Sequence, residues 1–226
     1  TEFNPIQTQT FQELFKSDRN VLVASPTGSG KTICAEFAIL KMISEGKAGG
    51  KCVYVAPKDE VVKRRYNEWT EKFGLSLFHD DTRVVMLTGD DISADLKLLS
   101  KGTIILSTVT NWDAVSRRWR QRKGVREDVT LFVADEMHFL GGDGGPTYEV
   151  VLSRMRYVAS QRSGGKKMRL VGLSSSLANA KEVAEWMGVT SSKSLFNFSP
   201  KVRPIPLEIY FSSFDQSGYA ARLLAM

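Results

Sequence analysis

Short apolar runs alternate with amphipathic stretches along most of the chain. The runs are rich in β-branched residues, as in Val21–Ala24 and Val129–Ala134, which is typical of strands buried on both faces of a sheet. After Lys31, apolar residues such as Ile33 and Phe37 recur at helical spacing instead. This alternation predicts an α/β fold, with a mainly parallel sheet, helices on both faces and right-handed crossovers.

The same pattern gives approximate bounds for each element. We expect strands over Val21–Ala24, Cys52–Ala56, Arg83–Leu87, Thr103–Leu106, Val129–Ala134 and Arg169–Leu173. We expect helices over Lys31–Glu45, Glu60–Phe73, Asn111–Gln121, Tyr148–Ala159 and Ala178–Met187, and one capped by Asp91 or Ser93 that ends at Leu99. Alternation in Leu207–Phe211 predicts one further strand, and Gly141–Pro146 predicts a loop.

Composition and cysteine content argue against a membrane-spanning protein, a disulfide framework and a metal centre. A chain of 226 residues that is 42% hydrophobic and 25% charged can form one globular domain. It has no apolar run of about 18 residues and no N-terminal signal peptide, so we expect no membrane span. Cys34 and Cys52 fit small buried residues in a reducing compartment, and with two histidines they are too few for a metal centre. The net charge of +6 suits a polyanionic partner or merely a soluble surface.

A glycine-rich segment, Ser25–Thr32, separates the first expected strand from the first expected helix. In this context, backbone N–H groups and the positive end of a helix dipole point at one anion, as in a phosphate-binding loop. The Lys31 ammonium can reach the β- and γ-phosphates, and the Thr32 hydroxyl can ligate Mg²⁺. The alternative is an ordinary glycine turn that caps a helix. We expect nucleotide contacts from Thr27, Gly28, Ser29, Gly30, Lys31 and Thr32.

Two adjacent carboxylates, Asp135 and Glu136, follow the apolar run Val129–Ala134. Open α/β sheets bind ligands at the carboxyl ends of their strands, so Asp135 can hold Mg²⁺ there. Glu136 can then act as the general base on the attacking water. Charged residues often end strands, so the pair alone is a weak indicator. Combined with the loop, it predicts a magnesium–nucleotide site in which Lys31 also takes part.

The motifs and their order resemble the first RecA-like domain of a superfamily-2 DExH-box RNA helicase, whose box is Asp135-Glu136-Met137-His138. The resemblance implies ATP and Mg²⁺ as cofactors, RNA as a partner, and a catalytic role for His138, which links the nucleotide to a coupling motif. Phe3–Gln7 resembles the segment that reads adenine, where Gln7 would hydrogen-bond the base. A turn that caps a helix is the alternative for that segment.

Further motifs follow in the family's order. Three segments resemble those that contact nucleic acid, and the residues expected to do so are Pro57, Lys58, Thr88, Gly89, Thr108 and Trp112. The triplet Ser174, Ser175 and Ser176 stands where the family carries Ser-Ala-Thr, which couples hydrolysis to strand separation. The third nucleic-acid motif has Asn111 in place of a lysine and so lacks a positive charge. The nucleotide-binding half therefore matches the family, while the RNA-coupling half is altered.

Other segments narrow the resemblance. Lys31–Ile39, Ser116–Trp119 and Ser199–Glu208 resemble the large spliceosomal helicases, which carry two helicase cassettes in tandem. The serine triplet resembles the second cassette, which implies a nuclear protein with a weak or silent ATPase that docks other spliceosomal proteins. By the same resemblance, residues 1–206 form the ATP-binding RecA-like domain. Residues 207–226 form a strand or linker that leads to a second RecA-like domain, the source of arginine fingers.

Three functions remain open at this point. They are an ATP-dependent RNA helicase module that acts in pre-mRNA splicing, an ATP-binding scaffold that hydrolyses poorly, and a DNA translocase of the same superfamily. Phosphate contacts carry no sugar identity, so the motifs alone do not separate RNA from DNA. The basic segment Arg117–Lys123 could face RNA, with Trp119 stacking on bases, or form a solvated helix end with Trp119 packed inward. We favour the solvated helix end.

Overall fold

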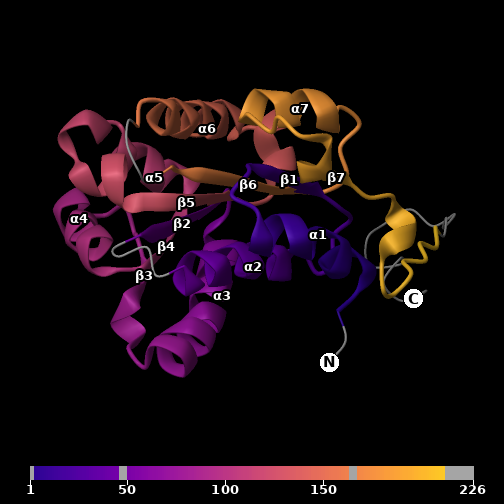
Figure 1. The fold of residues 1–226 in the computed structure, drawn as a ribbon, viewed down its shortest axis with the longest axis horizontal. Helices are drawn as coiled ribbons and strands as arrows, with labels where there is room; N and C mark the ends of the chain where they lie inside the picture. Colours follow the sequence, from indigo (N-terminus) through magenta and orange to yellow (C-terminus); the bar gives the residue numbers. More distant parts are fainter. Residues whose placement is uncertain (1–2, 46–49, 163–166, 212–226) are drawn as a thin grey trace, which may run out of the picture.

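A seven-stranded, all-parallel sheet forms the centre of the molecule, with strand order β3-β4-β2-β5-β6-β1-β7 (Figure 1). The computed structural model describes residues 3–45, 50–162 and 167–211. The strands are β1 Val21–Ala24, β2 Lys51–Ala56, β3 Val84–Met86, β4 Ile104–Thr108, β5 Val129–Ala134, β6 Arg169–Ser174 and β7 Leu195–Asn197.

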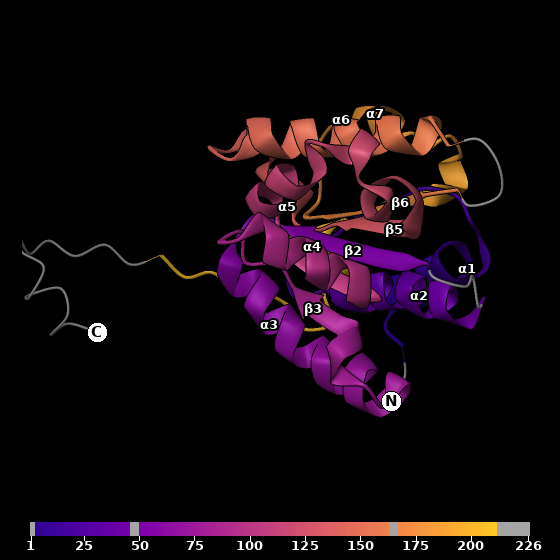
Figure 2. The same ribbon diagram turned by 90° about the vertical axis from the view of Figure 1, so that its left-hand side faces the viewer.

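Helices cover both faces of the sheet. They are α1 Pro5–Lys16, α2 Lys31–Ser44, α3 Asp59–Trp69, α4 Ile92–Lys101, α5 Val109–Ser116, α6 Gly145–Ser160 and α7 Ala180–Met187. Helices α1, α2 and α3 lie on one side of the sheet, and α5, α6 and α7 lie on the other (Figures 1 and 2). A π-helix, Thr70–Phe78, continues α3.

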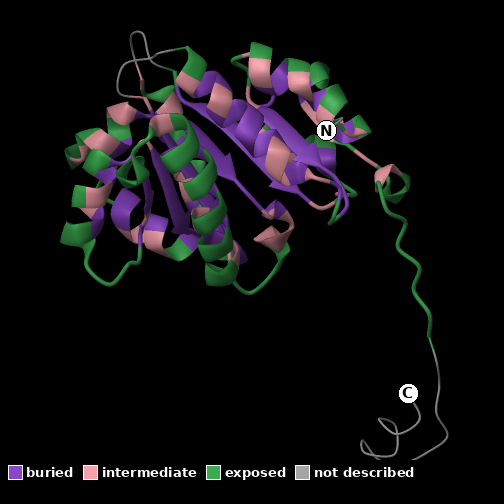
Figure 3. Cartoon of the chain, turned by 90° about the horizontal axis from the view of Figure 1, so that it is seen from below, coloured by how far each residue is buried: buried purple, intermediate pink, exposed green. Residues whose placement is uncertain are grey.

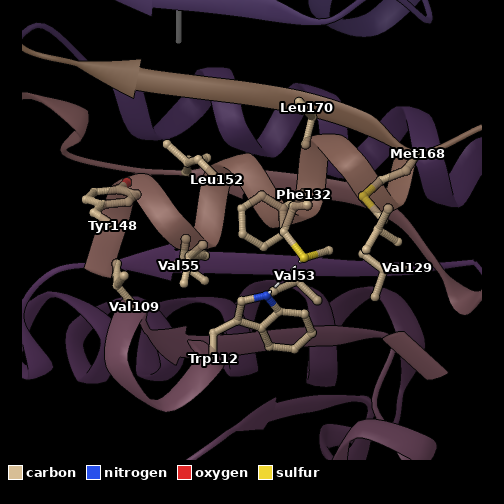
Figure 4. Close-up of a cluster of buried hydrophobic side chains, with 14 of the residues drawn as sticks. Val53, Val55, Val109, Trp112, Val129, Phe132, Tyr148, Leu152, Met168 and Leu170 are labelled. Atoms are coloured by element: carbon tan, nitrogen blue, oxygen red, sulfur yellow. Dashed lines mark hydrogen bonds between the residues drawn. The ribbon is translucent and has the colours of Figure 1, made fainter. Parts of the chain in front are cut away.

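Alternate positions along the strands fill two separate cores. Val53 and Phe132 pack with α5 and α6 in one core, part of which is seen in Figure 4. Tyr54, Leu131 and Val133 pack with α1, α2 and α3 in the other. Apart from β3 and β7 at the edges of the sheet, the strands are therefore buried on both faces, while the outer faces of the helices are exposed (Figure 3). This burial explains the apolar runs in the sequence.

The predicted fold class is confirmed, and each predicted strand and helix before residue 200 is present. The strands Val21–Ala24 and Val129–Ala134 have the predicted ends, and the ends of the other elements are shifted. The loop expected over Gly141–Pro146 is wrong at its end, because α6 begins at Gly145.

The last helix turns of the expected Asn111–Gln121 are wrong, because α5 ends at Ser116 and the chain continues as a short 3-10 helix. The strand expected over Leu207–Phe211 is also wrong, since these residues carry no strand and are exposed. Among the α-helices and strands, α1 and β7 were not predicted.

The structure also bears on the cysteines and on membrane insertion. Cys34 and Cys52 are buried and unpaired, as expected, and burial raises the pKa of Cys34 to about 11. None of the helices within the described ranges has the length and apolar character that crossing a bilayer requires.

Candidate functional site

Three predicted motifs meet because β5, β6 and β1 are neighbours that run parallel. Ala134 pairs with Gly172, and Ala24 pairs with Ser174, so the residues that follow each strand emerge at one edge. The Ser25 N–H donates to the Ser174 carbonyl at 2.9 Å. The glycine loop, the carboxylate pair and the serine triplet are therefore brought together.

The glycine loop has the backbone that a phosphate cradle requires. Gly28 and Gly30 have φ of +80° and +88°, in the left-handed region that favours glycine. Inside the loop, the Ser25 and Ser29 hydroxyls are hydrogen-bonded to each other at 2.8 Å. Helix α2 starts at Lys31, directly after the loop, so the loop and the free N–H groups of a helix N-terminus face the same space.

The Lys31 ammonium is buried beneath this loop. It donates to the carbonyls of Ser25 at 2.7 Å and Pro26 at 3.1 Å. Burial lowers the Lys31 pKa, and the negative charges of Glu136 and Asp135 act in the opposite direction. The ammonium that would meet a phosphate in the loop therefore already interacts electrostatically with both carboxylates.

The N-terminal segment lies against the same loop. Asn4 caps α1, and its backbone N–H and side-chain oxygen exchange hydrogen bonds with Gln7, both at 3.0 Å. The Asn4 side-chain amide also donates to the Ser29 carbonyl at 2.8 Å. A Cβ at Gly30 would lie 2.7 Å from Gln7 Nε2, so Gln7 both caps the helix and sits beside the loop. Asn4 was not among the expected residues, although the capping-box spacing could have revealed it.

Asp135 is buried at the end of β5, and three donors hold it in place. The Tyr54 hydroxyl donates to Oδ2 at 2.5 Å, and the Glu136 N–H donates to Oδ1 at 2.8 Å. The Tyr148 hydroxyl donates to the backbone carbonyl of Asp135. Burial, followed by the nearby Asp135 charge, raises the pKa of both tyrosines, so both hydroxyls keep their protons.

His138 lies between the carboxylate pair and the serine triplet. The Ser175 N–H donates to His138 Nδ1 at 3.3 Å, while Glu136 Oε2 lies 3.4 Å from the same nitrogen. A backbone N–H can only donate, so His138 Nδ1 must accept the hydrogen bond from Ser175 with its lone pair. Because Nδ1 then carries no proton, its contact with Glu136 is not a hydrogen bond. In the triplet itself, Ser174 is buried and the Ser176 hydroxyl donates to the Phe198 carbonyl at 2.7 Å.

The donor set fits a magnesium ion that is shared with phosphates. The Asp135 carboxylate and the Thr32 hydroxyl are oxygen ligands of the kind that Mg²⁺ prefers. Within the described ranges, no cluster of three or more His, Cys, Asp and Glu residues could hold a metal. Mg²⁺ usually takes only one or two protein ligands and completes its shell with water and phosphate, so this sparse set is sufficient.

The nucleic-acid candidates lie on the other half of the sheet. Pro57 and Lys58 follow β2, Thr88 and Gly89 follow β3, and Thr108 ends β4. Because the order is β3-β4-β2, these ends are adjacent to one another and separate from the loop at β1. Pro57, Lys58, Val109, Thr110 and Phe139 are among the residues that line an open pocket of about 410 Å³.

The Thr88–Gly89 turn is held from two sides. The buried Asp95 carboxylate accepts the N–H groups of Thr88 and Gly89 at 3.1 and 3.0 Å. The Asn111 side chain donates to the Thr88 carbonyl at 2.8 Å, so the residue that replaces a lysine makes a contact within the protein. Asp95 was not predicted, because nothing in its local sequence indicates this tertiary contact.

Trp112 does not belong to the nucleic-acid face, and its prediction is wrong. Its side chain is fully buried in the core drawn in Figure 4. Its indole N–H lies 3.4 Å from the sulfur of Met155. A motif position does not reveal which side of a helix meets the core.

The basic segment Arg117–Lys123 agrees with a solvated helix end. Trp119 is half-buried against Tyr157, and Arg122 donates to the Val115 carbonyl near the end of α5.

Comparison with known sequences identifies relatives over almost the whole chain. A family model described as DEAD/DEAH box helicase matches residues 4–183. The U5 small nuclear ribonucleoprotein 200 kDa helicase of Homo sapiens is 53% identical over 224 residues, which cover 99% of this chain and 10% of that protein. The DExH-box ATP-dependent RNA helicase DExH12 of Arabidopsis thaliana is 54% identical over 225 residues, with the same coverage. The chain thus spans about a tenth of the length of these relatives.

Solved structures that match this fold include helicases. The Hef helicase domain of Pyrococcus furiosus matches with a TM-score of 0.69 and 24% identity, over 92% of this chain and 40% of that one. The helicase MrfA, solved bound to DNA, matches with a TM-score of 0.66 and 20% identity, over 82% of this chain and 26% of that one. These likenesses show the fold alone. The family model, however, matches far more than half of the sequence, and the chain belongs to the DEAD/DEAH box helicases.

Proposed function

We propose that this chain is the ATP-binding half of a DExH-box RNA helicase cassette that acts in pre-mRNA splicing. The observation that carries the proposal is the convergence of the glycine loop, the carboxylate pair and the serine triplet at one edge of the sheet. Relatives named as a U5 small nuclear ribonucleoprotein helicase and as a pre-mRNA-splicing factor support the splicing role and a nuclear location.

Each residue at this edge has a distinct task in the proposed site. Lys31 and the loop amides hold the phosphates of ATP, and Thr32 and Asp135 hold Mg²⁺. The bound Mg²⁺ supplies charge neutralisation on the phosphates. Glu136 takes a proton from the attacking water, and His138 relays the state of the site to Ser175.

RNA is proposed to run along the ends of β2, β4 and β3. Lys58 supplies a positive charge there, and the backbone at Thr88, Gly89 and Thr108 supplies hydrogen-bonding groups. The proposed partners are RNA, a second RecA-like domain that follows residues 207–226, and other spliceosomal proteins. Arginine fingers from that second domain would stabilise the γ-phosphate during transfer.

A second candidate function is an ATP-binding scaffold that hydrolyses slowly. Asn111 favours it, because this side chain holds the Thr88 carbonyl instead of offering a positive charge to a phosphate. The serine triplet favours it too, since Ser176 is hydrogen-bonded to the Phe198 carbonyl. In the scaffold, ATP binding persists while its link to RNA is weakened.

The decisive experiment compares ATP binding and ATP hydrolysis in the intact cassette, meaning this chain together with the second RecA-like domain. We expect Mg²⁺-dependent ATP binding that Lys31→Ala abolishes, and hydrolysis that RNA stimulates and Glu136→Gln removes without loss of binding. Lys63→Ala, at an exposed position on α3, serves as the control. Tight binding with no RNA-stimulated turnover would establish the scaffold instead. Loss of ATP binding in the wild type would refute both functions.

A further inference from the structure

A buried phenol reaches the carboxylate at the centre of the proposed magnesium site. Tyr54 lies on β2 within the core beneath the sheet, and its ring packs edge-on against Trp69, with centroids 5.1 Å apart. Tyr54 pairs with Val133 on the neighbouring strand, so Asp135 follows its partner by two residues. This register places the Tyr54 hydroxyl 2.5 Å from Asp135 Oδ2.

The second oxygen of the same carboxylate is fixed as well. Asp135 Oδ1 accepts the N–H of Glu136 at 2.8 Å. A carboxylate with one fixed donor on each oxygen has little freedom to rotate about its side-chain bonds. Hydrogen bonds to a carboxylate are strong when the group is ionised, and the Tyr54 hydroxyl is one of the two donors that restrain this carboxylate.

We propose that Tyr54 is a positioning residue that orients the Asp135 carboxylate toward Mg²⁺. The proposal rests on the function proposed above, in which Asp135 holds the ion. Mg²⁺ demands nearly ideal octahedral geometry, so a ligand that is free to rotate binds it less well. Groups that hydrogen-bond metal ligands typically change metal affinity by about 10- to 100-fold when they are removed.

Tyr148 provides a matched control for Tyr54. It is equally buried, and its hydroxyl also donates to Asp135, but to the backbone carbonyl instead of the carboxylate. Tyr148 lies on α6 and belongs to the core drawn in Figure 4, whereas Tyr54 belongs to the core on the other face of the sheet. Tyr54→Phe and Tyr148→Phe therefore each delete one buried hydroxyl that is hydrogen-bonded to Asp135. Only Tyr54→Phe removes a donor from the Asp135 carboxylate.

The test is a magnesium titration of ATP binding by the intact cassette, followed with a fluorescent ATP analogue. For Tyr54→Phe we expect the Mg²⁺ concentration at half-saturation to rise about tenfold, with the Mg²⁺-free affinity for the analogue unchanged. For Tyr148→Phe, which leaves both donors to the Asp135 carboxylate in place, we expect a much smaller rise in the half-saturating Mg²⁺ concentration than for Tyr54→Phe. Thermal unfolding of each variant reports whether lost stability contributes. Direct Mn²⁺ binding, measured by water-proton relaxation, gives a second readout that needs no nucleotide.

The outcomes separate this inference from the proposed function. A wild type that binds the analogue without any magnesium dependence would refute the proposed function. Magnesium-dependent binding with equal shifts in the two tyrosine variants, or with none, would overturn the role of Tyr54 alone. In an Asp135→Asn background the Tyr54→Phe change should add no further shift in Mg²⁺ affinity, and an additive shift would also refute the role.

Discussion

The backbone at Glu136 is in the left-handed conformation, with φ of +55° and ψ of +43°. For a residue other than glycine this region costs about 1 kcal/mol or more. The Asp135 side chain accepts the Glu136 N–H, which holds the turn at the point where β5 ends. The proposed general base therefore lies on a strained segment directly after β5, at the carboxyl edge of the sheet.

This strain gives a prediction at Glu136. Glu136→Gly and Glu136→Ala both remove the carboxylate, but only glycine adopts this backbone without strain. We expect the glycine variant to have a free energy of unfolding about 1 kcal/mol above that of the alanine variant. Urea denaturation of both variants measures the difference. An alanine variant that is at least as stable as the glycine variant would contradict the assignment of strain.

Residues that carry a motif could be predicted from sequence, whereas residues that only support a motif could not. Lys31 and Asp135 were named in advance, and they lie where strand ends bring them together. Tyr54 and Asp95 were missed because their roles depend on which strands and turns become neighbours. Trp112 was misjudged because motif spacing does not reveal which helix face is buried.

At the scale of elements, Asp113 joins α5 to α6. Its buried carboxylate accepts hydrogen bonds from Arg117 Nε at 2.9 Å and from Arg154 Nη1 at 2.8 Å, and Arg154 also donates to Ser116. Burial by itself would raise the Asp113 pKa, but the two arginines more than offset that effect and lower it. The ionised form is therefore favoured in the folded state.

The sign of the pH effect follows from the lowered pKa. Stabilisation by Asp113 is fully present above its ordinary pKa of 3.8 and is lost as the pH falls through the lower folded value. We expect Asp113→Asn to cost about 2 kcal/mol near pH 7 and to flatten the acid decline of the free energy of unfolding. Glu185→Gln, in the exposed pair with Lys181, should change neither quantity. If the free energy of unfolding of Asp113→Asn fell as steeply with acid as that of the wild type, the stabilising role of Asp113 would be refuted.

Most element types followed from periodicity, while their ends depended on capping and tertiary contacts. Helix α1 was missed because its apolar positions are sparse, although Asn4 and Gln7 form a capping box that starts it. Strand β7 was missed because its sequence, Leu-Phe-Asn, has no β-branched residue and no alternation. The alternation in Leu207–Phe211 suggested a strand, but no neighbouring strand pairs with these exposed residues in the part of the chain that the structure describes.

At the scale of the molecule, the strand order divides the binding edge into two halves. The ends of β5, β6 and β1 carry the proposed nucleotide site, and the ends of β3, β4 and β2 carry the proposed RNA path. Alternating apolar runs predicted the parallel sheet but not this order. Strand order depends on crossovers that local sequence does not specify.

Because the two proposed sites lie on different halves of the edge, a substitution in one half should weaken RNA binding without weakening ATP binding. In the intact cassette, Lys58→Ala should lower RNA affinity several-fold and reduce the dependence of log affinity on log salt by about one unit. ATP affinity should stay unchanged, because Lys58 follows β2 and not β1. Fluorescence anisotropy at several salt concentrations measures this, with Lys63→Ala as a control of equal charge. A parallel loss of ATP affinity, or an equal effect in the control, would contradict the division.

The geometry at His138 has a consequence for the order in which its Nδ1 atom can bind Ser175 and a proton. The lone pair on His138 Nδ1 accepts the hydrogen bond from the Ser175 N–H, and the Glu136 carboxylate lies beside the same nitrogen. A proton that Glu136 takes from water and passes to Nδ1 would occupy that lone pair and release Ser175. Because Nδ1 has a single lone pair, it can accept either the Ser175 N–H or a proton but not both, and in the proposed site the imidazole would therefore act as an exclusive switch.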